Sequence, residues 1–196
     1  MEFKRNHKPL ILASKSPRRL ELLNSAGIYP KVMESRFNEP ESDGQAPDDF
    51  AKMLAYFKAL DVANTTTNYY VLGADTIVVY KNKILLKPKS DEEAKDMLTM
   101  LSGNTHEVIT GFSLISPQAE KIITLSSKTK VSFRRLSFDE INWYINTNDP
   151  FDKAGGYGIQ SKAASFASSI NGSYTNVVGL PLSEVIELME KERIIK

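Results

Sequence analysis

Six consecutive residues, Ser14 to Arg19 (SKSPRR), concentrate three cations and two hydroxyl groups between an apolar run and an amphipathic stretch. Ser16 followed by Pro17 favours a helix start, because serine caps helices and proline suits the first helical position. A helix N-terminus attracts anions, and Lys15, Arg18 and Arg19 would add full charges to it. The segment therefore predicts an anion site suited to a polyphosphate, although a capped helix with exposed basic residues would have the same sequence.

Asp75 interrupts the most apolar segment of the chain, VLGADTIVV. A carboxylate in a buried strand is costly unless it has a use, and Gly73 and Ala74 beside it leave room for close approach. Metal ligation and general-base catalysis are the uses that we expect. An aspartate that caps a turn at the end of a strand is the alternative.

Three further polar residues carry weaker signals. Lys58 lies at the edge of an apolar helical stripe, Lys87 ends an apolar run before Pro88, and Glu39 belongs to a loop. Taken alone, each lysine is more typical of a side chain whose stem covers apolar surface, and the glutamate is more typical of a solvated loop residue.

The loop DKAGGYGIQ, residues 152–160, is the second Gly-rich candidate for ligand contact. Its glycines permit close approach of the backbone to a ligand, and Lys153 offers a cation. Gln160 carries a donor and an acceptor on one amide, as the recognition of a base edge requires. A long structural turn is the alternative.

Composition excludes several classes of site. The 196 residues are 41% hydrophobic and 25% charged, with a net charge of +1, no cysteine and two histidines. This excludes disulfides, thiolate chemistry and a three-histidine zinc site, and it gives no global basic excess for nucleic acid. No apolar run is long enough to span a bilayer or to act as a signal peptide, so we expect a cytoplasmic protein with no membrane partner.

Local patterns predict the order of the elements. Strands are expected at 10–13, 29–34 and 69–80, and a hairpin at 105–116 and 121–133. Helices are expected from Pro17, from Asp48 as a cap, and after the capping boxes SDEE (90–93) and SFDE (137–140), with a last one from Ser183. Residues 148–160 and 171–182 read as loops. We predict one α/β fold with a mixed sheet, which a cleft could divide into two lobes.

Five segments, in sequence order, resemble the Maf-like nucleotide pyrophosphatases. They are LASKSPRRLELL; VLGADTIVV; LKPKS together with EEAKDMLTMLSGNTHEVITG; DKAGGYGIQ; and INGSYTNVVGLPL. The resemblance runs from about Leu10 to the final helix. It implies an extension at residues 1–9 and a single Maf-like domain at residues 10–196. It also implies the inosine-triphosphate-pyrophosphatase-like fold, an elongated mixed sheet flanked by helices with a central cleft.

The resemblance further implies hydrolysis of a nucleoside triphosphate to the monophosphate and pyrophosphate, with Mg²⁺ or Mn²⁺. The Gly-rich loops are similar to those of the branch that prefers dTTP and UTP, and family analogy favours a homodimer. Asp75 would accept the proton and, with Glu39, hold the metal. The other residues of the active cleft would be Lys58 and Lys87. Substrate contacts would come from Ser14, Arg18, Arg19, Thr76, Lys153 and Gln160.

Two other functions remain open at this point. The family is associated with inhibition of septum formation, so the chain could act by binding a division partner. A phosphatase of the haloacid-dehalogenase type also has an acidic residue after a strand. That chemistry needs a second aspartate two residues later, where this chain has Ile77.

Overall fold

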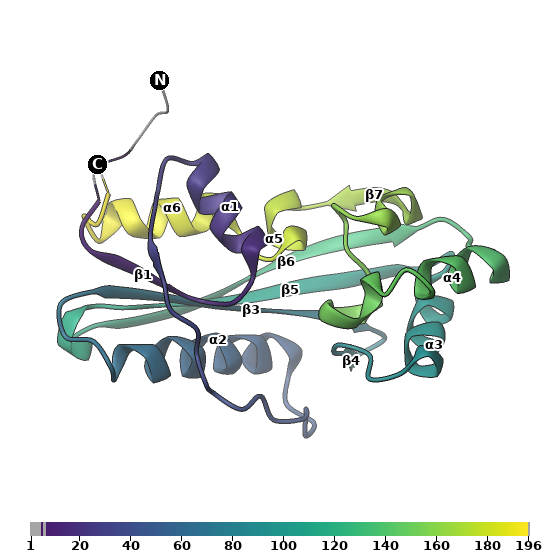
Figure 1. The fold of residues 1–196 in the computed structure, drawn as a ribbon, viewed down its shortest axis with the longest axis horizontal. Coiled ribbons are helices and arrows are strands. Elements are labelled where there is room, and N and C mark those ends of the chain that lie inside the picture. The colour runs from purple at the N-terminus through teal and green to yellow at the C-terminus, as the bar shows by residue number, and fades with distance from the viewer. Residues whose placement is uncertain (1–4, 6, 196) are drawn as a thin grey trace. The chain divides into compact units, whose positions relative to one another are not determined.

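The computed structural model describes Arg5 and residues 7–195. Its strands and helices are interspersed along the chain, and four short 3-10 helices, η1–η4, lie among them (Figure 1). The elements are β1 (Leu10–Ala13), α1 (Pro17–Ser25), β2 (Lys31–Val32), α2 (Pro47–Ala63), β3 (Tyr70–Tyr80), β4 (Lys83–Leu85), α3 (Asp91–Leu101), β5 (Thr105–Ile115), η1 (Pro117–Ala119), β6 (Ile122–Phe133), α4 (Phe138–Ile145), η2 (Asp149–Asp152), η3 (Ala154–Gly156), η4 (Lys162–Phe166), β7 (Ala167–Asn171), α5 (Tyr174–Val178) and α6 (Leu182–Lys191).

The strands form a mixed sheet, as predicted. Their order is β2-β1-β3-β5-β6-β7, and β4 pairs with β3 off this path. β1 pairs in parallel with β2 and β3, whereas the β3–β4 and β6–β7 pairs are antiparallel. The mixed α/β class is therefore confirmed.

The chain divides into two compact units, each made of several segments. The first contains the chain up to Asp75, residues 110–127 and the chain from Gly179, and the second contains residues 76–109 and 128–178. Three of the boundaries fall inside β3, β5 and β6, and the fourth falls at the end of α5. Each unit has hydrophobic clusters of its own, so each is described by itself.

In the first unit, β1 is buried on both faces. Ile11 and Ala13 pack with residues of α2, whereas Leu10 and Leu12 pack with residues of α1 and α6. A strand covered by helices on both faces needs a continuous apolar run, and LILA supplies one. Figure 1 shows α2 on one face of these strands and α1 and α6 on the other.

Two glycines let α2 pack directly against the sheet in the first unit. A Cβ at Gly73 of β3 would lie 2.7 Å from the backbone nitrogen of Ala59, and one at Gly111 of β5 would overlap the carbonyl of Ala51. Any side chain at either position would push the helix away. The close fit determines how near the side chains of α2 come to β3.

The core of the second unit is rich in aromatic rings. Phe133 and Tyr157 meet edge to face with their centroids 4.7 Å apart, and Tyr144 and Phe166 meet similarly at 5.2 Å. His106 lies among these rings with 2% of its surface exposed, and its Nε2 is 2.7 Å from the Tyr157 hydroxyl. His106 is therefore part of this aromatic core.

Both capping boxes begin helices, as predicted. The Ser90 hydroxyl accepts a bond from the Glu93 amide, and Ser137 and Glu140 make both reciprocal bonds. The prediction that Asp48 caps α2 is wrong. The helix begins at Pro47, directly after Ala46, because proline is favoured at the first helical position.

The loops predicted at 148–160 and 171–182 are only partly irregular. They contain η2, η3 and α5, and β7 was not predicted at all. Such short elements have weak periodicity, so tertiary contacts decide them. None of the helices in the described part of the chain combines the length and apolar character needed to cross a bilayer.

The His106 side chain makes the stability of the fold depend on pH. Burial lowers its pKa from 6.5 to about 4, so the unfolded chain binds a proton more readily than the folded one between these values. This contribution to the free energy of unfolding is complete above pH 6.5 and decreases as the pH falls toward 4, by about 3 kcal/mol at most.

We therefore expect His106→Phe to flatten the pH dependence of the free energy of unfolding. Phenylalanine keeps an edge-to-face ring but cannot take up a proton. Urea denaturation of the parent and the variant at pH 7.5, 6.5, 5.5 and 4.5 checks this. Parallel curves for the two proteins over this range would contradict it.

Candidate active site

Asp75 belongs to a small cluster of charged side chains from three segments of the first unit. It is 7% exposed on β3, and its carboxylate accepts a short hydrogen bond from the Lys58 ammonium on α2. The same ammonium lies 2.7 Å from Oε1 of Glu39, in the loop before α2. One lysine therefore joins two carboxylates, and residues with individually weak sequence signals form one cluster.

The basic segment contributes Arg19 to the same unit. Its Nε donates to the carbonyl of Gly179 at 2.7 Å, and its Nη1 donates to the Ser14 hydroxyl at 3.1 Å. Ser14 also accepts from the Ser16 amide at 3.1 Å, which leaves its own proton available for donation. The guanidinium is thus held at the start of α1 by a carbonyl and a hydroxyl.

The electrostatics of Arg19 connect it with the carboxylate cluster. Burial lowers the pKa of its guanidinium, and the charge of Asp75 opposes this by raising it. Arg18 lowers the pKa further and Glu39 raises it. These mutual effects mean that the two arginines and the two carboxylates lie within electrostatic range of one another.

The rest of the SKSPRR segment differs from the simplest expectation. The Ser16 side chain makes no capping hydrogen bond, although its position at the start of α1 is as predicted. Lys15 forms an exposed ion pair with Glu34. Arg18 is half-buried.

The remaining predicted residues belong to the second unit. Thr76 follows Asp75 on β3 and is half-buried. Lys87 and Gln160 are exposed.

Lys153, also in the second unit, is 10% exposed, and its ammonium contacts only protein acceptors among the described residues. These are the Asp149 carbonyl at 2.7 Å, Asp149 Oδ1 at 3.0 Å and Asp152 Oδ1 at 2.5 Å. The three acceptors match the three donors of the group. The side chain runs across Gly158, where a Cβ would lie 2.6 Å from its Cε, so this glycine leaves room for it.

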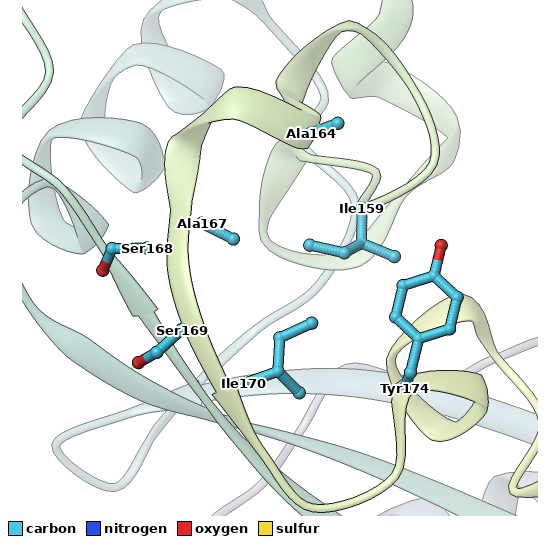
Figure 2. A pocket seen from close by; sticks show the side chains of 7 residues that line it. All are labelled: Ile159, Ala164, Ala167, Ser168, Ser169, Ile170 and Tyr174. Atoms are coloured by element: carbon cyan, nitrogen blue, oxygen red, sulfur yellow. The ribbon is translucent and has the colours of Figure 1, made fainter.

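A groove of about 370 Å³ opens in the second unit beside β7 (Figure 2). Ile159, Ile170 and the ring of Tyr174 face one another there, whereas the hydroxyl groups of Ser168 and Ser169 point away from them. No charged side chain lines it. Its chemistry therefore does not suit a polyphosphate, unlike the cluster in the first unit.

The donor set can be tested for a divalent cation. Among residues 5 and 7–195, no three His, Cys, Asp or Glu side chains group as a metal site would require. Glu39 and Asp75, however, already share one cation, the Lys58 ammonium. A divalent ion that keeps several waters and binds phosphate needs only one or two carboxylates, so this pair fits Mg²⁺ or Mn²⁺.

Sequence reasoning missed the partners that position these side chains. The Gly179 carbonyl follows Arg19 by 160 residues, so no local pattern could indicate it. Asp149 precedes Lys153 by four residues, and that spacing was a readable signal. Ile77, where a dehalogenase-type phosphatase needs its second aspartate, is fully buried and apolar.

Comparison with known proteins identifies the family of this chain. The family model described as "Maf-like protein" matches residues 9–192. The chain belongs to the Maf family. Its Maf-like region thus begins one residue before the segment in which the resemblance was seen, and it includes every predicted site residue.

Curated relatives of the Maf-family chain are similar over nearly their whole length. The "dTTP/UTP pyrophosphatase" of Geobacillus sp. (strain WCH70) is 47% identical over 94% of this chain and 98% of the relative. Proteins with the same name from Geotalea uraniireducens (strain Rf4) and Alkaliphilus oremlandii (strain OhILAs) are 47% and 52% identical, over 93% and 89% of this chain and 94% and 91% of theirs.

A solved structure, the Ham1 protein of Staphylococcus aureus, aligns with 94% of this Maf-family chain and 100% of its own. The sequence identity is 13% and the TM-score is 0.49. That level is too low to carry an argument, so the fold class rests on the strand order and the family match.

The contacts of Lys153 predict a stability effect in the second unit. Lys153→Met would leave the half-buried Asp149 carboxylate without its cation, and we expect the free energy of unfolding to decrease by about 2 kcal/mol. Urea denaturation checks this. Lys162→Met, at an exposed lysine nearby, is the matched control, and an equal effect of both substitutions would contradict the assignment.

Proposed function

We propose that this chain hydrolyses dTTP and UTP to the nucleoside monophosphate and pyrophosphate. The observation that carries the proposal is the cluster of Asp75, Lys58 and Glu39, with Arg19 held within electrostatic range of it. In such a cluster the cations would bind a polyphosphate, and the carboxylates would bind its counter-ion and an attacking water. The curated name shared by the relatives supports the reaction and the choice of pyrimidine nucleotides.

Glu39 and Asp75 would hold a divalent cation, Mg²⁺ or Mn²⁺. When bound, it would neutralise charge on the phosphate oxygens and polarise the reacting phosphorus. Lys58 supplies a positive charge beside the two carboxylates. Its role would then be to stabilise negative charge that develops in the transition state.

Residues of the first unit would bind the triphosphate and activate the attacking water. Arg18 and Arg19 would bind the triphosphate, and the Ser14 hydroxyl would donate to a phosphate oxygen. Asp75 would orient a water molecule and accept its proton as the oxygen attacks the α-phosphorus. The bond from the α-phosphorus to the bridging oxygen then breaks, and pyrophosphate leaves with that oxygen.

Residues of the second unit have proposed roles of a different kind. Lys87 would stabilise charge on the leaving group, and Gln160 and Thr76 would contribute to the choice of base. Lys153, with three protein acceptors, would act on the substrate only through the loop that it holds. The homodimer and the cytoplasmic location stay predictions.

The reaction is tested by assaying pyrophosphate and phosphate release from dTTP, UTP, dCTP, ATP, GTP and 7-methyl-GTP, with Mg²⁺, with Mn²⁺ and with chelator. Reaction in ¹⁸O-labelled water should place the label in the monophosphate and not in pyrophosphate, because attack is at the α-phosphorus. Label in released orthophosphate would instead indicate γ-phosphate hydrolysis. No turnover of any nucleotide would favour the alternative of a septum-formation regulator that acts by binding.

We expect Asp75→Asn to reduce kcat for UTP by at least about 10²-fold while the circular dichroism spectrum is unchanged, because the amide cannot accept the proton of water. Asp49→Asn is the matched control, since Asp49 is an exposed carboxylate on α2 that pairs with Lys52. A kcat for Asp75→Asn near that of the control would show that the proposed base is wrong.

We expect Gln160→Ala to reduce discrimination among bases more than affinity for phosphate. Loss of a base contact should lower kcat/KM for UTP about tenfold and leave that for ATP nearly unchanged. Product inhibition by pyrophosphate, which has no base, should be the same in the parent and the variant. Equal losses for UTP and ATP would contradict the role of Gln160.

A further inference from the structure

The segment that carries Glu39 is held against α2 at several points. Residues 33–46, between β2 and α2, form no strand or helix, and Figure 1 shows this part of the chain passing across α2 before it turns into that helix. Irregular segments of this length are commonly functional. The part at residues 35–39 is called the strap below.

Asp61, near the end of α2, fixes the beginning of the strap. Its Oδ2 accepts a hydrogen bond from the Ser35 hydroxyl at 3.0 Å and another from the Arg36 amide at 2.7 Å. The Ser35 hydroxyl oxygen in turn accepts from the Phe37 amide at 3.0 Å. One carboxylate therefore organises the backbone of the strap, with charge-assisted bonds that are stronger than neutral ones.

The strap has two more contacts on the same helix. The ring of Phe37 stacks on that of Phe57, with centroids 5.2 Å apart and planes 18° from parallel. Glu39 then reaches Lys58 at 2.7 Å. Phe57, Lys58 and Asp61 are spaced i, i+1 and i+4, so they lie on adjoining parts of one helix surface.

This arrangement has a consequence for the proposed cation site. Glu39 is exposed and lies in an irregular segment, so without support its carboxylate would sample many positions. Asp75 is fixed in β3. Keeping the two carboxylates within reach of one cation requires that the strap itself be fixed to α2.

We infer that Asp61 is a positioning residue: it holds the strap on α2 so that Glu39 stays beside Asp75 to share a divalent cation. The inference rests on the proposed function, because it assumes that the two carboxylates bind such a cation. Asp61 contacts neither carboxylate in any bond described above. Outer partners of metal ligands commonly affect metal affinity about 10- to 100-fold.

The test measures the Mn²⁺ affinity of three variants in the absence of nucleotide. Asp61→Ala removes both acceptors and suits a helix, Asp61→Asn keeps one oxygen that can accept the same bonds, and Asp49→Ala removes an exposed carboxylate elsewhere on α2. Mn²⁺ affinity is measured by electron paramagnetic resonance. Hydrogen exchange of the Arg36 and Phe37 amides reports whether the strap is held.

For Asp61→Ala we expect roughly 10-fold or greater weakening of Mn²⁺ binding and faster exchange of both amides. Asp61→Asn should restore most of both, and Asp49→Ala should behave as the parent. In kinetics, the Mg²⁺ concentration for half-maximal activity should rise while kcat at saturating Mg²⁺ stays near the parent value. A purely structural role would lower stability without this shift.

Two results would overturn the inference. Unchanged amide exchange in Asp61→Ala would mean that Asp61 does not hold the strap. Faster exchange with unchanged Mn²⁺ affinity would mean that the strap does not position Glu39. Failure of the proposed function is distinguishable, because in that case the parent protein itself would bind no Mn²⁺ or release no pyrophosphate.

Discussion

The contact between Asp75 and Lys58 is the constraint on which the first unit depends. A carboxylate inside a buried strand costs several kcal/mol unless a cation and hydrogen bonds compensate it. The compensating ammonium comes from α2, so that helix must lie close to β3. Gly73 and Gly111 make the close packing possible, because neither strand presents a Cβ to the helix there. The apolar residues of β1 and α2 then supply the free energy that holds this arrangement.

Two lysines of this chain each join two carboxylates, with different consequences. Lys153 contacts Asp149 and Asp152, which are four residues and one residue away in sequence, so its bonds stabilise one local loop. Lys58 contacts carboxylates from a strand and from an irregular segment, and it brings together parts of the chain that have no local reason to meet. The same pairing of charges thus fastens a loop in one unit and assembles a candidate reaction centre in the other.

Family membership indicates the reaction, and the geometry of the charged cluster indicates which residues would perform it. The family match covers residues 9–192, and relatives at 47% to 52% identity share the name dTTP/UTP pyrophosphatase, which indicates a class of reaction. The geometry adds the reason for particular residues: Arg19 is half-buried and held by Ser14 and Gly179, and Asp75 and Glu39 both contact the Lys58 ammonium. It also distinguishes Lys153, whose donors are already used within the protein, from the residues proposed to contact substrate.

Local patterns were sufficient for the mixed α/β class, the long strands and the helices that begin at capping boxes. These features depend on periodicity and on neighbours within four residues, which are visible in any sequence. The importance of SKSPRR and Asp75 could also be seen locally, since a basic helix start and a carboxylate in an apolar run violate ordinary expectation. Three features could not be seen locally: β7, the bond from Arg19 to the Gly179 carbonyl, and the bonds that Asp61 accepts from residues 35 and 36. Long-range packing alone brings those groups within bonding distance.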